Sequence, residues 1–325
     1  MGRYLVTGAA GFIGAKVSEL LLADGHEVVG MDNLNDAYDI RLKEWRLAQL
    51  TPFPKFQLQK QDITQWDAVQ KTIETTGPFD GIINLAARAG VRASVENPWI
   101  FLETNTTGTL NLLEAARKYH IPKFVLASTS SIYGADAPQP TSETADSSKP
   151  LQPYSASKKG AEAMAHAYHY LHGIDVTIFR FFTVFGPAGR PDMVMFRFVQ
   201  WMSEGRPVLL NGDGNQSRGF TYVDDIARGT IAGLKPLGYE IINLGGHEPI
   251  TMNDMIAQLE GMIGCKANVT RRPLHKADML SNLADVSKAR QMLGWEPQVN
   301  LMEGMRRLVA WYQAERSWAS QIVTE

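Results

Sequence analysis

The chain has 325 residues, 44% of them hydrophobic, which is enough for a large core and suggests about two domains. Its net charge of −2 gives no basic surface for nucleic acid, and no apolar run reaches the roughly 18 residues of a membrane span. Cys265 is the only cysteine, which excludes a disulfide framework and a cysteine-based metal site. We therefore expect a cytoplasmic globular protein without a metal and without nucleic-acid or membrane partners.

Short apolar runs alternate with amphipathic stretches in the first half of the chain. The pattern predicts strands at 4–7, 27–31, 56–59, 81–85, 124–128 and 176–181, and helices at 12–24, 66–75, 97–119 and 154–172. Apolar strands that alternate with helices indicate an α/β fold with a doubly wound parallel sheet, of the Rossmann type. Beyond Gly186, glycines and prolines separate short elements, and two further helices are expected at 251–263 and 301–313. We expect this smaller mixed α/β region to cover the carboxyl edge of the sheet.

Three glycines connect the first expected strand to the first expected helix. Gly8, Gly11 and Gly14 have the spacing and the context of the dinucleotide-binding fingerprint, although a plain glycine turn is the alternative. Asp32 ends the second strand, where a carboxylate accepts hydrogen bonds from the adenosine ribose and repels a 2′-phosphate. Asp32 therefore favours NAD over NADP. Asp62 and Ile63 follow the third strand and either bracket the adenine or form a turn.

Hydroxyl side chains end the fifth expected strand and precede a Tyr–Lys pair. Residues 128–131 place four hydroxyls at the sheet edge where ligands bind in doubly wound folds. Tyr154 and Lys158 are four apart and share one face of a helix. We expect the ammonium to lower the pKa of the phenol, so that Tyr154 can take a proton from a sugar or alcohol hydroxyl.

These motifs together resemble the extended short-chain dehydrogenase/reductase superfamily, and within it the nucleotide-sugar epimerases and dehydratases. The matching stretches are Gly8–Gly14, Asp32, Asn84–Ala87, Asn105–Thr109, Ser128–Gly134, Tyr154–Lys158 and Arg180–Pro187, and the likeness runs from Arg3 to about Trp311. It implies that Thr129 and Ser130 contact the reacting sugar, that Tyr154 is the general base and that Lys158 binds the nicotinamide ribose. It also implies a homodimer paired through the helices at 97–119 and 154–172.

The same resemblance implies an NAD site, a UDP-sugar site and a division into two domains. The expected NAD contacts are Gly8, Gly11, Phe12, Ile13, Gly14, Asp32, Asn33, Asp62, Ile63, Leu85, Ala86, Ala87, Asn105, Ser128, Tyr154, Lys158 and Phe181. The expected sugar contacts are Arg88, Arg92, Ser94, Thr129, Ser130, Ser131, Thr183, Arg190, Arg218 and Asp278. Residues 1–183 and 223–248 would form the NAD domain, and 184–222 and 249–325 the nucleotide-sugar domain.

Two loops, 86–98 and 183–193, look like the sugar-binding loops of UDP-glucuronate 4-epimerases. Arg190 is the best candidate for a bidentate clamp on the uronate carboxylate, and Thr183 adds a hydroxyl. Arg88 and Arg92 add cations, although each arginine has a solvated salt bridge as its alternative role. At the nucleotide end, the chain departs from the usual pattern with Gly219 after Arg218 and Ala277 before Asp278.

The predicted activity is C4 epimerisation of UDP-glucuronate to UDP-galacturonate through a 4-keto intermediate, without decarboxylation. Resembling decarboxylases carry Glu after a Thr-Ser pair, where this chain has Ser131, and 4,6-dehydratases carry Asp-Glu where it has Ser130 and Ser131. The alternatives are a 4-epimerase of the UDP-glucose or UDP-N-acetylglucosamine type, a UDP-glucuronate decarboxylase, an oxidoreductase with exchangeable NAD, and an NAD-binding sensor or scaffold without turnover.

Overall fold

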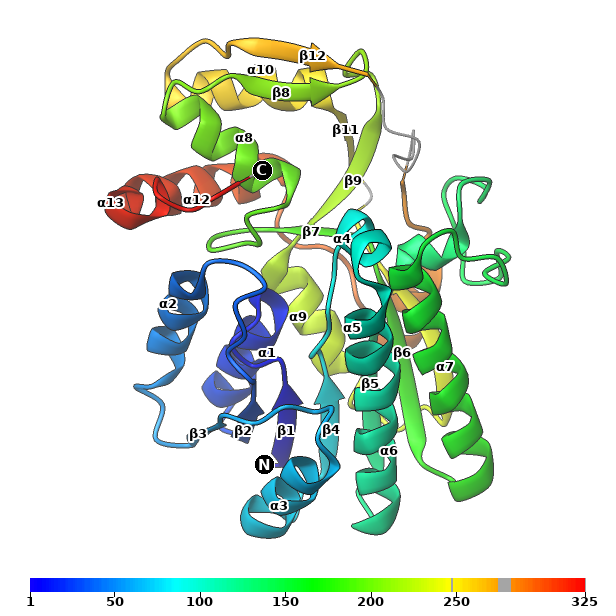
Figure 1. Ribbon diagram of the computed structural model, residues 1–325. Helices are drawn as coiled ribbons and strands as arrows, with labels where there is room; N and C mark the ends of the chain where they lie inside the picture. The colour runs from blue at the N-terminus through cyan, green and yellow to red at the C-terminus, as the bar shows by residue number, and fades with distance from the viewer. Residues whose placement is uncertain (247, 274–281, 325) are drawn as a thin grey trace.

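A seven-stranded, fully parallel sheet forms the centre of the larger part of the molecule (Figure 1). The computed structural model describes residues 1–246, 248–273 and 282–324. The strand order is β10-β6-β5-β4-β1-β2-β3. The strands are β1 (Arg3–Thr7), β2 (Glu27–Met31), β3 (Phe56–Gln59), β4 (Gly81–Asn84), β5 (Lys123–Thr129), β6 (Asp175–Phe181) and β10 (Tyr239–Leu244). The central strands β4 and β5 are buried along their whole length, as expected for a parallel sheet covered on both faces.

Helices cover both faces of this sheet, and alternate residues of each strand face opposite cores. On one face, α1 (Phe12–Ala23), α9 (Val223–Ala232) and α11 (Ser287–Leu293) pack with Val6 and Ile83. On the other face, α3 (Trp66–Thr76), α6 (Gly108–Lys118) and α7 (Pro153–His172) pack with Leu5 and Ile82. The doubly wound α/β fold predicted from the sequence is therefore confirmed.

A smaller mixed region lies over the carboxyl ends of the parallel strands, at the top of Figure 1. It contains β7 (Thr183–Phe185), β9 (Ser217–Tyr222) and β11 (Pro249–Thr251) in one sheet and β8 (Val208–Asn211) and β12 (Val269–Arg272) in another. Its helices are α8 (Val194–Ser203), α10 (Met252–Ile263), α12 (Leu301–Ala314) and α13 (Arg316–Ala319). They share a third core that includes Trp201, Met255 and Leu308.

Several helical regions differ from the prediction, and helices α8, α9, α11 and α13 were not predicted. The helix expected at 97–119 is divided into α5 (Pro98–Leu102), a π-helical segment η1 (Glu103–Thr107) and α6, and a separate α4 (Val91–Glu96) precedes it. Helix α2 (Ile40–Leu50) was not predicted, because Lys43 and Arg46 lie among the residues that it buries and weaken its apolar pattern. A short 3-10 helix, η2 (Ser130–Tyr133), follows β5.

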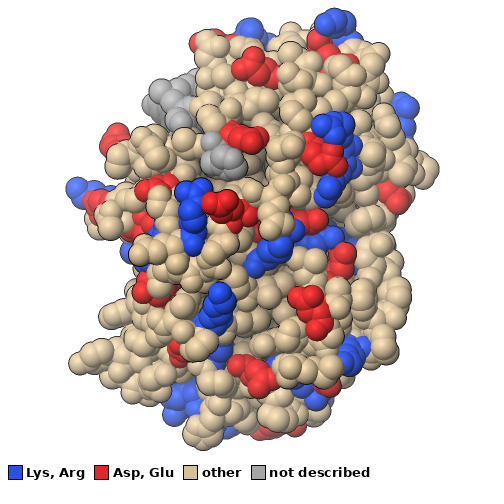
Figure 2. All heavy atoms as spheres, turned by 180° about the vertical axis from the view of Figure 1, so that it is seen from behind, with Lys and Arg blue, Asp and Glu red and all other residues tan. Residues whose placement is uncertain are grey.

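The surface carries no broad region of one charge on the face drawn in Figure 2, where basic and acidic side chains are interspersed. Within the residues described, no helix is both long and apolar enough to cross a membrane.

Candidate active site

The glycine loop after β1 brings the start of α1 against the sheet. Gly8 has a φ of +68°, which favours glycine, and a Cβ added to Gly14 would lie 2.0 Å from the Gly8 carbonyl oxygen. Helix α1 therefore begins close to the strand ends, with Gly11 at its N-cap and Phe12 and Ile13 in its first turn. Its free N–H groups and its dipole make this end suitable for phosphate groups.

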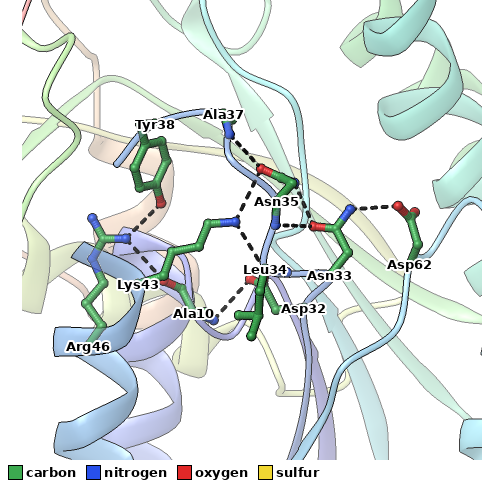
Figure 3. A network of polar contacts seen from close by, with 10 residues as sticks. All are labelled: Ala10, Asp32, Asn33, Leu34, Asn35, Ala37, Tyr38, Lys43, Arg46 and Asp62. Atoms are coloured by element: carbon green, nitrogen blue, oxygen red, sulfur yellow. Dashed lines mark hydrogen bonds and ion pairs between the residues drawn. The ribbon is translucent and has the colours of Figure 1, made fainter. Parts of the chain in front are cut away.

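Asp32, directly after β2, connects the glycine loop to helix α2 (Figure 3). One carboxylate oxygen accepts the Ala10 N–H at 3.1 Å, and the other accepts the Leu34 N–H at 2.9 Å. Lys43 of α2 places its Nζ 3.4 Å from the second oxygen, and both side chains are buried. The glycine cradle and this carboxylate fit a dinucleotide without a 2′-phosphate, as the sequence predicted.

Asn33 and Asp62 form the next part of the same edge (Figure 3). Asn33 Nδ2 donates to Asp62 Oδ2 at 2.6 Å. Burial alone would raise the pKa of Asp62, but hydrogen bonds from Thr64 and Asn33, with the charge of Arg88, hold it below its ordinary value. Ile63 is buried against Gly108 of α6. The segment after β3 therefore presents the ionised carboxylate of Asp62 next to the buried apolar side chain of Ile63.

Asn105 fixes the loop that follows β4. This loop contains Leu85, Ala86 and Ala87. The Asn105 Oδ1 accepts the Arg88 N–H at 2.9 Å, and its Nδ2 donates to the Arg88 carbonyl at 3.0 Å and to Ser157 Oγ at 2.9 Å. Asn105 is fully buried within η1, and π-helical turns are frequent at functional sites. The π-helical turn thus positions an amide that connects the loop to α7.

Tyr154, at the start of α7, lies half-buried beside the hydroxyls that end β5. Its hydroxyl is hydrogen-bonded to the Thr129 side chain. The structure reverses the predicted direction of its pKa, because burial raises it above the ordinary value, and the hydrogen bond of Thr129 and the charge of Arg190 oppose this only in part. Lys158 is not the source of the opposing charge, since its Nζ turns toward β5 and donates to the Ala127 carbonyl at 2.9 Å.

Lys158 is buried, and burial lowers its pKa to about 8, against the opposing charge of Glu162 one turn further along α7. Glu162 is itself buried and forms two hydrogen bonds with Arg180 of β6, at 3.0 and 2.8 Å. It also accepts a 2.6 Å bond from Ser128 Oγ. Neither Glu162 nor Arg180 was predicted to have a role, because no local motif distinguishes their contact from an ordinary core contact.

Arg190 lies in the loop after β7 and acts electrostatically on Tyr154. Its Nε and Nη2 pair with Asp192 at 3.0 and 2.5 Å, and Nη2 also donates to the Ala89 carbonyl at 3.1 Å. Burial alone would lower the pKa of Arg190, but Asp192 more than offsets this and raises it. The two predicted sugar loops therefore meet beside the phenol of Tyr154.

The remaining predicted sugar contacts lie in several elements. Ser130 Oγ accepts a 3.3 Å bond from Asn282, and Ser131 donates its N–H to Thr129 Oγ1 at 3.2 Å. Ser94 is fully buried in α4, and its hydroxyl donates to the Val91 carbonyl. The others are Thr183 in β7, Arg92 exposed on α4 and Arg218 in β9, while the expected NAD contact Phe181 ends β6. Asp278 lies outside the described residues.

A glycine loop on a parallel sheet, a carboxylate after the second strand and a Tyr–Lys helix at the same edge are typical of dinucleotide-dependent enzymes of the short-chain dehydrogenase/reductase type. The model of the NAD dependent epimerase/dehydratase family matches residues 4–245. The chain belongs to this family.

Its relatives include the UDP-glucuronate 4-epimerase of Thermodesulfobacterium geofontis, which is 54% identical over 312 residues and is matched over 96% of each chain. A crystal structure of the UDP-glucuronic acid 4-epimerase of Bacillus cereus, in complex with UDP-glucuronic acid and NAD, superposes with a TM-score of 0.90. That protein is 35% identical, and the match covers 96% of this chain and 99% of the other. The UDP-glucose 4-epimerase of Thermotoga maritima, with UDP-glucose, gives a TM-score of 0.89 at 30% identity, over 97% and 99% of the two chains.

Proposed function

We propose that this protein is an NAD-dependent UDP-glucuronate 4-epimerase that interconverts UDP-glucuronate and UDP-galacturonate. The observation that carries the proposal is the position of Arg190, whose charge acts on Tyr154 from a loop that also contacts the loop after β4. A cation beside the general base suits a sugar that carries a carboxylate close to its reacting C4 hydroxyl. The 54% identical relative is a UDP-glucuronate 4-epimerase, which supports the same substrate.

The residues assigned to the reaction act through proton transfer and placement. Tyr154 takes the proton of the C4 hydroxyl and later returns it, while Thr129 orients that hydroxyl. When bound, NAD would supply the reversible hydride transfer to and from C4 that inverts this carbon. Lys158, with Nζ on the Ala127 carbonyl, lies where the ribose of the cofactor is expected.

A uronate substrate brings a specific hazard, because its 4-keto intermediate is a β-keto acid that can lose CO2. We propose that Arg190 and Thr183 hold the carboxylate so that the C–C bond stays out of line with the carbonyl π system. Ser131, where decarboxylases carry Glu, leaves this position without an acid. Arg88, Arg92 and Arg218 would contribute cations to the sugar and the diphosphate.

The test is to incubate the purified protein with UDP-glucuronate without added NAD and to separate the products. UDP-galacturonate supports the proposal, whereas UDP-xylose or its 4-keto precursor indicates a decarboxylase. Conversion of UDP-glucose but not of UDP-glucuronate would sink the uronate assignment and retain the epimerase. Tyr154→Phe should abolish turnover while NAD remains bound, and full activity in that variant would refute the role of Tyr154.

Three further features belong to the proposal. The chain is a homodimer paired through α5–α6 and α7, supported by the exposed Trp99 and Leu102 on α5, which are 77% and 50% accessible.

The NAD domain comprises residues 1–183 and 223–248, because α9 and β10 return to the large sheet after the small strands. The second domain comprises 184–222 and 249–325, of which α11 packs against the large sheet. The cytoplasm is the expected location, where UDP-sugars and NAD are both available.

A further inference from the structure

Arg46 of α2 is a buried arginine that the reaction described above does not use. Its side chain is 3% exposed. Nη1 donates to the Ala10 carbonyl at 3.1 Å and to the Tyr38 hydroxyl at 2.8 Å (Figure 3). Nε and Nη2 donate to the Ala188 carbonyl at 3.0 and 2.6 Å. One planar guanidinium therefore joins two segments that are far apart in the sequence.

The two segments are the binding loops of different ligands. Ala10 lies between Gly8 and Gly11 in the dinucleotide loop. Ala188 lies two residues before Arg190, in the loop that we assign to the uronate. Ala188 is fully buried with a φ of +50°, a conformation that is uncommon for a residue other than glycine. Arg46 accordingly stabilises a strained turn from which Arg190 projects.

The loops also meet directly beneath Arg46. A Cβ built on Gly189 would lie 3.8 Å from the ring of Phe12, the first residue of α1. The guanidinium carbon lies 5.9 Å from the centroid of the same ring. A displacement of the dinucleotide loop would thus be transmitted to the turn before Arg190 through packed atoms and through the hydrogen bonds of Arg46.

The charge of Arg46 is not neutralised by these contacts. Within the described part of the chain, its hydrogen-bond partners are backbone carbonyls and a phenol, and none is a carboxylate. A buried, uncompensated cation is costly unless a ligand or a structural need retains it. Beside a loop that accommodates a diphosphate, this charge favours the loaded state of the protein.

We propose that Arg46 is a positioning residue that couples the two ligands, so that NAD on the glycine loop strengthens binding of the uronate through Arg190, and the reverse. Because linkage is reciprocal, UDP-glucuronate must raise the affinity for NAD by the same factor. The identity of the second ligand rests on the proposed function, whereas the connection between the loops does not. Lysine cannot replace Arg46, because a point charge lacks the planar fork that reaches both carbonyls.

The test is a calorimetric titration of NAD into protein from which the bound cofactor has been removed, in the presence and absence of saturating UDP-glucuronate, with all proteins carrying Tyr154→Phe to prevent turnover. The parent should show an affinity ratio of at least about 5-fold, in the range usual for coupled sites. Arg46→Lys and Arg46→Met should bring the ratio below about 2-fold. Arg41→Met is the matched control, because Arg41 lies on the same helix but, among the described residues, forms its hydrogen bonds with Asp39 and Gln321 only, and it should keep the parent ratio.

The readout is the ratio of the NAD affinities measured with and without UDP-glucuronate. A structural defect that weakens the binding of both ligands independently leaves this ratio unchanged. A ratio near 1 in the parent, or the parent ratio retained in both Arg46 variants, would overturn the coupling. Should Arg46→Met fail to fold by circular dichroism, Arg46→Lys keeps the charge and carries the test. If the parent binds UDP-glucose but not UDP-glucuronate, the proposed function fails, and the titration repeated with UDP-glucose decides the role of Arg46 separately.

Discussion

The buried ammonium of Lys158 lowers the stability of the folded protein. Its pKa falls from 10.5 to about 8 because it is buried. Between these two values the unfolded chain binds the proton and the folded chain does not, so stability rises with pH through this window and the full cost remains below about pH 8. That cost is roughly 3 kcal/mol.

We therefore expect Lys158→Met to inactivate the protein while changing the pH dependence of its unfolding. At pH 7 the variant should be more stable than the parent by roughly 3 kcal/mol, because it lacks the buried charge. Most of this difference should disappear by pH 10, as measured by urea unfolding at both pH values. Lys159→Met is the control, since Lys159 is partly exposed and its pair with Glu162 at 3.4 Å should contribute below about 1 kcal/mol. If the difference in free energy of unfolding between the variant and the parent did not change with pH, the lowered pKa of Lys158 would be contradicted.

Asp192 controls a second titration, that of Tyr154. Its negative charge raises the pKa of the phenol, whereas the charge of Arg190 lowers it. Asp192→Asn should therefore move the ascending limb of the kcat profile to lower pH, because the phenolate forms more readily. Arg190→Met should move it to higher pH. Asp67→Asn, on α3, is the control with no expected shift. If Asp192→Asn and Arg190→Met moved the ascending limb of the kcat profile in the same direction, this electrostatic explanation would be excluded.

The sequence predicted the residues that act through local pattern and missed those that act through contacts distant in the sequence. Asp32 is recognisable because it follows the second strand, and Tyr154 because Lys158 lies four residues further along the same helix. Lys43 and Arg46 lie on a helix whose buried polar residues hide its apolar face, so that their partners on β2 and in the 188–190 turn depend on the tertiary fold. The expected effect of Lys158 on Tyr154 was wrong because four-residue spacing does not determine where an Nζ points.

Helix α1 and the glycine loop behave as one element, since α1 begins against the loop without a side-chain cap. Gly14→Ala would place a methyl group 2.0 Å from the Gly8 carbonyl oxygen and force α1 away from β1. We expect a loss of about 1–3 kcal/mol in stability and weaker NAD binding, measured by thermal unfolding with and without NAD.

Gly261→Ala is the matched control for this substitution. Gly261 lies in α10 with no atom within 4 Å of an added Cβ, so that alanine should stabilise the protein by up to about 1 kcal/mol. If Gly14→Ala retained the NAD-dependent increase in unfolding temperature, the close packing of α1 would not be needed for the cofactor.

At the scale of elements, the prediction succeeded where the spacing of apolar residues is constant along a segment. It failed where that spacing changes within the segment. Strands β1 to β6 and helices α1, α3, α7, α10 and α12 were expected within a few residues of their observed ends, whereas β10 of the same sheet was not predicted. The region 97–119 has helical periodicity throughout, but the π-helical turn at Glu103–Thr107 shifts its phase and buries Asn105. A change of phase of this kind cannot be read from apolar spacing alone.

At the scale of the whole molecule, α2 holds the two regions together from the side of the sheet. Trp45 donates to Glu315 at 2.9 Å, and its ring packs edge-to-face with Trp311 of α12 at 5.8 Å. Arg41 on the same helix reaches Gln321. The sheet and the smaller region are thus connected through α2, which leaves the helical layer on the other face, α5 to α7, available for a second copy of the chain.

Helix α5 joins that layer to the active site. Trp99 and Leu102 point to the surface, while Phe101 between them packs edge-to-face on Tyr154 at 6.2 Å. Trp99→Asp places a charge in the proposed interface, and we expect light scattering to give half the mass of the parent. Because α5 would lose its support, kcat should fall although no substrate contact is changed. Val323→Asp alters an equally exposed residue near the C-terminus and should change neither mass nor kcat. A parent that runs as a single chain would refute the dimer.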